Sequence, residues 1–227
     1  MKQDTAFKEE IMDEMGDSHE SSSSVTPMRS DAFSLTDGEK KTKIEEHFHK
    51  IMETLGLDMT DDSLKGTPHR VSKMFVNEIF SGLNPNNKPK MSTFSNKYNY
   101  DKMLVEKNIS VNSTCEHHFL PIVGKAHVAY ISTGKVIGLS KMNRIVDYYS
   151  RRPQVQERLT IQILEELKAA LNTDSVAVII EAQHLCVTSR GITDRTSTTV
   201  TVQYSGEFCN ESTKSEFLNY IGNGINI

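Results

Sequence analysis

One stretch of the sequence indicates the fold class, and it reads ISVNSTCEHHFLPIVGKAHVAYISTGKVIGL from residue 109 to residue 139. Apolar side chains alternate with other residues in three runs within it, at residues 109–115, 125–131 and 135–139. A period of two is typical of β-strands, and Gly134 marks a turn between the last two runs. We therefore expect consecutive antiparallel strands in this part of the chain.

Two helices are predicted before these strands. Thr36 and Glu39 have the spacing of a capping box, and apolar residues then recur at helical intervals up to Gly56. A second helix is expected from Pro68, which suits the first turn of a helix, to Gly82. The polar stretch that separates this helix from the first strand is expected to form a loop.

Helices and strands are also expected after residue 139. Ser140 is expected to cap a short helix, and Pro153 is expected to open a longer helix with a stripe of leucine and isoleucine. Two further runs, at residues 176–187 and 196–204, indicate two more strands, and a short helix is expected to close the chain. Together these elements predict an α+β fold, with helices on one face of an antiparallel sheet.

The composition is that of a soluble protein with one main domain. The chain has 227 residues, of which 37% are hydrophobic and 25% charged, and no apolar run approaches the roughly 20 residues of a membrane span. The first residues carry no apolar signal sequence, so we expect a cytoplasmic protein. Only three cysteines occur, and this small, odd number argues against a disulfide framework and leaves metal binding or catalysis as their roles.

Residues 1–35 differ in composition from the rest of the chain. They contain eight acidic and three basic residues and a run of four serines, whereas the remainder is nearly neutral. We expect a disordered acidic tail at residues 1–35 and one domain at residues 36–227, with helices and a loop at residues 36–100 and the sheet with its helices at residues 101–227. The near-neutral charge of the domain argues against a nucleic-acid partner, and no membrane partner is expected.

The sharpest local feature is the CEHH cluster at residues 115–118, where the first strand ends. A thiolate and an imidazole three residues apart can converge on one zinc ion, although a buried structural cysteine beside surface histidines has the same sequence. A second cluster contains His184 and Cys186. Residues two apart on a strand point to the same face, so this pair would offer a nitrogen and a sulfur together.

The two clusters provide more candidate ligands than a metal needs, namely Cys115, His117, His118, His184 and Cys186. A structural zinc site closes with four protein ligands, while a catalytic site uses three and keeps a position for water. Five candidates favour a catalytic site in which two histidines remain as general acid and base. A structural zinc site stays an alternative, because spacing alone does not say which histidines are ligands.

Basic residues near these clusters could together clamp several phosphates. They are Arg70, Lys73, Lys141, Arg144, Arg151, Arg152 and Arg190. For any one of them, an ordinary solvated helix face is the alternative. Glu157 at a helix start is either a favourable charge near the helix N-terminus or a carboxylate that accepts N–H groups from a base. The sequence contains neither a P-loop nor the signature of zinc base deaminases.

Five segments of the sequence resemble the signature blocks of type I GTP cyclohydrolase. In chain order they are GTPHRV at residues 66–71, STCEHH at 113–118, IGLSKMNRI at 137–145, RPQVQERLT at 152–160 and HLCVTSRG at 184–191. The resemblance implies a tunnelling fold, in which antiparallel sheets of neighbouring subunits join into a barrel, and a homodecamer of two stacked pentamers. It also implies zinc-dependent conversion of GTP and water to formate and 7,8-dihydroneopterin triphosphate, the first step of tetrahydrofolate and pterin biosynthesis.

The resemblance also implies roles for individual residues. Cys115, His118 and Cys186 match the zinc ligands of the family, and His117 and His184 match its acid–base pair. The substrate contacts are implied in three groups: Glu157 with Gln156 for the guanine edge, Ser140 for the ribose-phosphate region, and Arg70, Lys73, Lys141, Arg144 and Arg190 for the triphosphate, from more than one subunit. A zinc-stabilised binding protein and a pterin- or deazapurine-processing relative remain alternatives, which formate release from GTP would separate.

Overall fold

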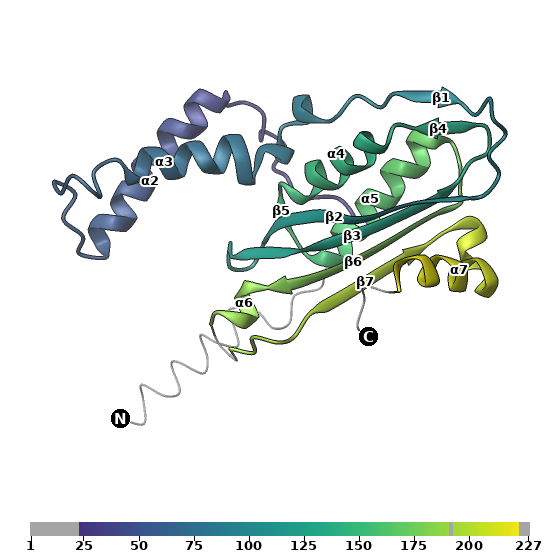
Figure 1. Cartoon of the computed structure of the whole chain (residues 1–227). Coiled ribbons are helices and arrows are strands. Elements are labelled where there is room, and N and C mark those ends of the chain that lie inside the picture. The colour runs from purple at the N-terminus through teal and green to yellow at the C-terminus, as the bar shows by residue number, and fades with distance from the viewer. Residues whose placement is uncertain (1–22, 191–192, 223–227) are drawn as a thin grey trace.

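The computed structural model describes residues 23–190 and 193–222. A five-stranded sheet in the order β5-β2-β3-β6-β7 forms its centre (Figure 1). Its strands are β2 (Met103–Cys115), β3 (Pro121–Ile131), β5 (Pro153–Gln154), β6 (Val176–His184) and β7 (Thr199–Tyr204). The long strands pair antiparallel as predicted, whereas the short β5 pairs parallel with the end of β2.

Helices α4 (Leu139–Ser150) and α5 (Gln156–Leu171) pack on one face of the sheet (Figure 1). Val176, Val178 and Ile180 of β6 belong to the core beneath them, as expected for alternate residues of a strand. The intervening Ala177 and Ile179 face the other way, toward helix α7 (Glu211–Ile221). The α+β class is confirmed, but the expectation that helices cover one face alone is wrong at this end of the sheet.

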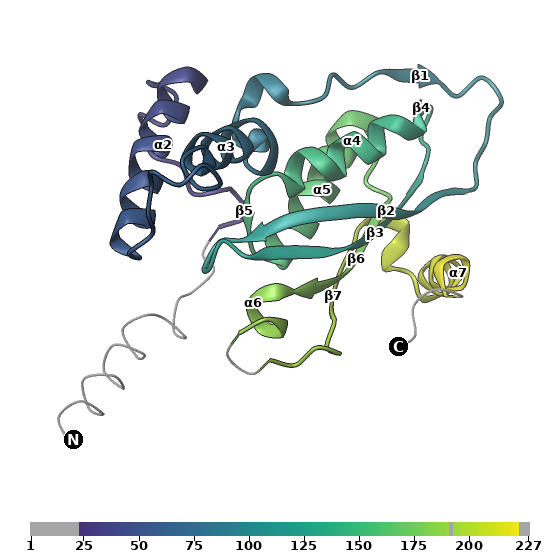
Figure 2. The same cartoon turned by 60° about the vertical axis from the view of Figure 1, so that its left-hand side comes forward.

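The N-terminal helices α2 (Asp37–Thr54) and α3 (Thr67–Met74) pack on each other beside the sheet (Figure 2). The predicted capping box is present, because Thr36 Oγ1 accepts from the Glu39 amide at 3.2 Å while the Glu39 carboxylate accepts from the Thr36 amide at 2.8 Å. The second helix ends earlier than predicted and continues as a π-helical turn, Phe75–Ile79, and a 3₁₀ turn, Ser81–Leu83. No helix in the described part of the chain is long and apolar enough to cross a membrane.

The predicted loop between α3 and the first strand contains further structure. A 3₁₀ turn spans Pro85–Asn87, and strand β1 (Thr93–Ser95) pairs antiparallel with β4 (Lys135–Ile137). Three residues are too few to show an alternating pattern, so β1 depends on its long-range pairing rather than on its own sequence.

Two predicted helix starts are displaced. Helix α4 begins at Leu139 after Gly138 as its N-cap, so Ser140 lies inside the first turn and does not cap it. Pro153 does not open a helix, because it lies in β5 and α5 begins only at Gln156. The extended segment is held by the end of β2: Cys115 pairs with Gln154, and the Glu116 amide donates to the Gln154 carbonyl at 3.0 Å. This pairing fixes the start of α5 beside the CEHH cluster.

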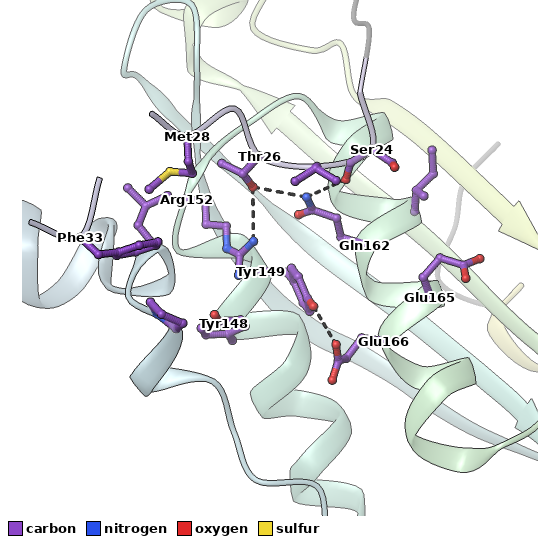
Figure 3. A pocket seen from close by; sticks show the side chains of 14 residues that line it. Ser24, Thr26, Met28, Phe33, Tyr148, Tyr149, Arg152, Gln162, Glu165 and Glu166 are labelled. Atoms are coloured by element: carbon purple, nitrogen blue, oxygen red, sulfur yellow. Dashed lines mark hydrogen bonds between the residues drawn. The ribbon is translucent and has the colours of Figure 1, made fainter. Parts of the chain in front are cut away.

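The segment that precedes α2 contacts helix α5 directly. Residues 1–22 of the predicted tail lie outside the described residues, but residues 23–35 are described, and Thr26 is only 7% exposed. Figure 3 shows Ser24 and Thr26 against Gln162, whose side-chain amide donates to the Ser24 carbonyl at 2.8 Å and to Thr26 Oγ1 at 3.3 Å. Arg152 also donates to Thr26 Oγ1 at 3.3 Å. Donors on the folded domain therefore hold a segment whose own composition is typical of disorder.

Deletion of residues 1–26 should lower the melting temperature more than deletion of residues 1–22. The longer deletion removes the acceptors of Gln162 and Arg152, which we expect to cost about 2 kcal/mol and to lower the melting temperature by about 4 to 8 °C. The shorter deletion leaves those acceptors in place and serves as the control. Equal melting temperatures of the two proteins, measured by calorimetry, would contradict the anchoring role.

Candidate active site

Three side chains from the two sequence clusters converge at one end of the sheet. Cys115 is the last residue of β2, His118 lies in the turn that follows, and Cys186 lies on the short helix α6 (Leu185–Thr188). Their ligand atoms all lie within 4.8 Å of one another. The turn is closed by two backbone hydrogen bonds, from the Cys115 amide to the Leu120 carbonyl and from the Phe119 amide to the Cys115 carbonyl. It brings His118 back toward the end of its own strand.

The strand geometry predicted for His184 and Cys186 is wrong, although Cys186 does meet the first cluster. Strand β6 ends at His184, so His184 and Cys186 do not lie on one strand face. A single helical turn carries Cys186 toward Cys115 instead. Burial, followed by the neighbouring Cys115 sulfur, raises the pKa of Cys186 to about 11. A cation held between the two sulfurs would favour their thiolate forms, so two sulfurs and one imidazole fit a zinc site chemically.

A cavity of about 630 Å³ opens beside this cluster. Its lining includes Cys115, Cys186 and both predicted acid–base residues, His117 and His184, together with Gln156 and Glu157 from the first turn of α5. The volume is in the range of small-molecule sites. Gln156 is buried and Glu157 is exposed, so of these two neighbours only Glu157 presents a solvated side chain.

The two histidines have different surroundings. Half-burial lowers the pKa of His184, an effect that the charge of Glu157 partly offsets, so the neutral imidazole is favoured at neutral pH. His184 Nε2 lies 2.7 Å from Gln156 Oε1. His117 is more exposed, with Nδ1 at 3.8 Å from Cys115 Sγ and Nε2 at 3.9 Å from a Glu116 carboxylate oxygen.

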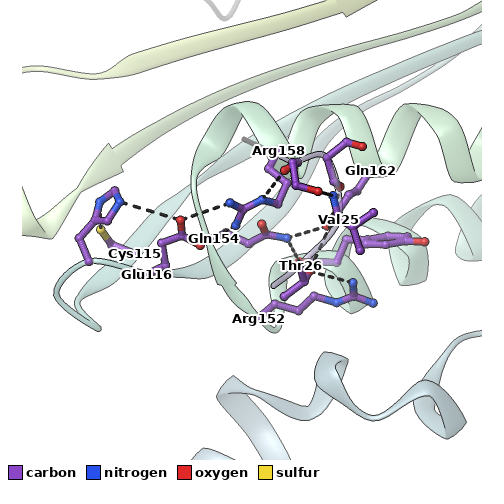
Figure 4. Close-up of polar contacts among 12 residues, drawn as sticks. Val25, Thr26, Cys115, Glu116, Arg152, Gln154, Arg158 and Gln162 are labelled. Carbon is purple, nitrogen blue, oxygen red and sulfur yellow. Dashed lines mark hydrogen bonds and ion pairs between the residues drawn. The ribbon is translucent and has the colours of Figure 1, made fainter. Parts of the chain in front are cut away.

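A partly buried ion pair that sequence reasoning missed supports this side of the site (Figure 4). Arg158, only 5% exposed, donates to both carboxylate oxygens of Glu116, at 2.5 and 3.3 Å, and its Nε donates to the Ser23 carbonyl at 3.0 Å. Glu116 in turn lies beside His117. Both residues lie inside the family segments noted above, but nothing in their spacing indicates that they pair across 42 positions of sequence.

Replacement of Arg158 by leucine should lower the free energy of unfolding by about 3 kcal/mol, because Glu116 loses its bidentate partner. The matched control is Arg151→Leu, whose exposed pair with Asp147 should be worth about 0.5 kcal/mol. Denaturant unfolding of both variants measures the difference. Equal losses would show that burial adds nothing to the Arg158 pair.

The other predicted substrate residues lie apart from the cavity lining. Ser140 and Arg144 are exposed on α4, Lys141 is half-buried beside them, and Arg70 donates to the Ser63 carbonyl and to Thr67 Oγ1. Lys73 and Arg190 are exposed. The positive charge of Arg190 offsets a small part of the rise in the pKa of the Cys186 thiol. Among the described residues of this chain that line the cavity, none is one of these predicted phosphate contacts.

An α+β fold that gathers two cysteines and a histidine beside a cavity with further imidazoles and a carboxylate has the features of a metal-dependent enzyme. The sequence model of the family described as GTP cyclohydrolase I matches residues 44–222. The chain therefore belongs to the GTP cyclohydrolase I family of enzymes, which confirms the resemblance noted in the sequence.

Individual relatives agree with this assignment. The chain is 63% identical to GTP cyclohydrolase 1 of Flavobacterium johnsoniae over 213 residues, which cover 94% of this chain and 96% of the relative. It is 56% identical to GTP cyclohydrolase 1 of Aeromonas salmonicida and 55% identical to that of Vibrio parahaemolyticus, each over 85% of this chain and 88% of the relative.

Among solved structures, the apo form of the archaeosine synthase QueF-Like matches 46% of this chain and 93% of its own, with 25% identity and a TM-score of 0.38.

Proposed function

We propose that this chain catalyses the zinc-dependent hydrolysis of GTP at purine C8, with release of formate and rearrangement to 7,8-dihydroneopterin triphosphate. Membership of the GTP cyclohydrolase I family supports GTP as the substrate. The observation that carries the metal-dependent part is the convergence of Cys115, His118 and Cys186 beside the cavity. This reaction would be the first step of tetrahydrofolate and pterin biosynthesis.

In this proposal the three converging residues hold the zinc ion. When bound, zinc supplies a Lewis acid that makes water nucleophilic near neutral pH. His117, backed by Glu116, donates a proton to N7 of the purine as the imidazole ring of the base opens. His184, which burial keeps neutral, accepts and returns a proton in the later C–N cleavage and ribose rearrangement.

The remaining substrate contacts are proposed on the same basis. The Glu157 carboxylate accepts the N1–H and 2-amino N–H of guanine at the cavity wall. Ser140 and the basic residues are proposed to bind ribose and triphosphate from neighbouring copies of the chain, in a barrel-forming decamer of two pentamers. Their position away from the cavity of their own chain supports a neighbour as the contributor. Three free cysteines support a cytoplasmic location.

The experiment that tests the proposed function combines three measurements on the purified protein. Zinc per chain, formate release and pterin fluorescence are measured after incubation with GTP. We expect about one zinc per chain and equal amounts of formate and pterin. Bound zinc without formate would indicate a binding protein, and formate without pterin would contradict the rearrangement step.

A further inference from the structure

We infer that Gln156 is a positioning residue for His184: its buried amide fixes the orientation and the tautomer of the imidazole, instead of reading the guanine edge. The inference rests on the proposed acid–base role of His184. It differs from what the family resemblance implies for Gln156, because this side chain is 1% exposed whereas its neighbour Glu157 is exposed.

The orientation of the Gln156 amide follows from its partners. Gln156 Nε2 lies 3.0 Å from the Ile180 carbonyl oxygen, 2.9 Å from the Thr199 carbonyl oxygen and 3.1 Å from Thr201 Oγ1. Carbonyl oxygens only accept hydrogen bonds, so the atom that faces them must be the NH₂ group. A reversed amide would place its oxygen against two carbonyl oxygens, where no hydrogen bond can form. The Gln156 oxygen must therefore point at His184.

Two threonine hydroxyls support the same orientation of the Gln156 side-chain amide. Thr160 Oγ1 donates to the Gln156 backbone carbonyl at 2.8 Å, which uses its only hydrogen. In the 2.7 Å contact between Thr160 and Thr201, the donor must then be Thr201. Since Thr201 has also used its hydrogen, its oxygen can only accept from the Gln156 amide. The proton of each threonine hydroxyl is thereby assigned, and the two hydrogens of the Gln156 amide are shared among three acceptors.

The assignment determines which nitrogen of His184 carries a proton. Gln156 Oε1 is an acceptor and lies 2.7 Å from His184 Nε2, so Nε2 is the protonated nitrogen of the neutral ring. Nδ1 is then the nitrogen with the lone pair, and proton exchange with the substrate passes through it. An imidazole without this acceptor would populate both tautomers and rotate more freely, so fewer molecules would present Nδ1 to the substrate.

The first test replaces Gln156 by leucine, which keeps the approximate size and removes the acceptor. We expect kcat for formate release to fall by about 10- to 100-fold, while KM for GTP and zinc per chain stay within about twofold of the parent. A role of Gln156 in guanine recognition predicts a change in KM for GTP rather than in kcat. A rise of KM with unchanged kcat would therefore overturn the inference.

A matched pair at Thr201 covers the case in which the leucine variant does not fold. Thr201→Val is isosteric and suits a strand, but it lacks the hydroxyl that accepts from Gln156, whereas Thr201→Ser keeps that hydroxyl. We expect kcat to fall by about 3- to 10-fold in the valine variant and to stay near the parent value in the serine variant. Equal kcat values for the pair would overturn the inference.

A double variant separates this inference from the proposed function. In the His184→Ala background, adding Gln156→Leu should not lower kcat further, because Gln156 acts through the missing imidazole. An additional loss of about 10-fold or more would overturn the positioning role and leave the role of His184 intact. Near-normal kcat in His184→Ala alone would instead overturn the proposed acid–base role, and with it this inference.

Discussion

Replacement of Cys186 by serine should leave the protein without bound zinc and lower formate release from GTP by about 1000-fold or more. Cys115, His118 and Cys186 are the three side chains whose ligand atoms converge, and a serine hydroxyl does not replace a thiolate as a zinc ligand. Two remaining ligands would be too few to hold the ion during dialysis. Cys115→Ser and His118→Ala should give the same result, measured as zinc per chain and initial rate.

Cys209→Ser is the matched control for the loss of a thiol. Cys209 is exposed at the end of the 3₁₀ turn Gly206–Cys209, its Sγ lies 3.9 Å from the Tyr204 carbonyl oxygen, and it is not in the metal-binding group found among the described residues. This variant should keep both zinc and activity. Full zinc occupancy in Cys186→Ser would contradict the ligand assignment. A folded but inactive metal-free protein would favour a catalytic over a structural zinc site, because removal of a structural zinc unfolds the region it holds.

The parts of the fold that the sequence predicts well are those with a strong local pattern. The alternation in residues 109–131 predicts β2 and β3. In β2 the buried Ile109, Val111 and Ser113 alternate with exposed residues, so a register shift of one residue would expose them. The capping box at Thr36 and Glu39 is also local, and both of its hydrogen bonds are present. The sequence indicated Cys115 and Cys186 as candidates because few residue types bind zinc, even though the strand geometry expected around Cys186 is not what the structure has.

The features that the sequence does not predict depend on partners far along the chain. Gln154 is extended because it pairs with Cys115, so the proline before it does not open a helix. A donor on α5 holds the segment that contains Thr26, and the low apolar content of this segment does not predict the contact. The resemblance implies that Gln156 contacts the guanine edge with Glu157, but carbonyl oxygens of β6 and β7 accept from its buried amide. Long-range contacts of this kind leave no period or spacing in the sequence.

Replacement of Glu157 by glutamine should lower kcat/KM for GTP by about 30- to 1000-fold while zinc stays bound. If the carboxylate accepts two N–H groups of guanine, glutamine keeps the size but exchanges one acceptor for a donor, so one hydrogen bond is lost and one donor faces another. Mispaired polar groups of this kind should cost on the order of 2 to 4 kcal/mol in the transition state. The measurements are kcat/KM, zinc per chain and melting temperature.

In the alternative role, the negative charge of Glu157 in the first turn of α5 stabilises the helix through a favourable interaction with the helix dipole. That role predicts a loss of stability of roughly 0.3 to 1 kcal/mol and unchanged GTP kinetics. Glu211→Gln is the matched control, because Glu211 also lies in the first turn of a helix, α7, and is absent from the cavity lining among the described residues. If both variants lose stability to a similar degree but only Glu157→Gln loses turnover, the carboxylate reads the base. If Glu157→Gln turns over GTP normally, base recognition must come from other residues of the cavity, and the exposed acid at the start of α5 serves the helix alone.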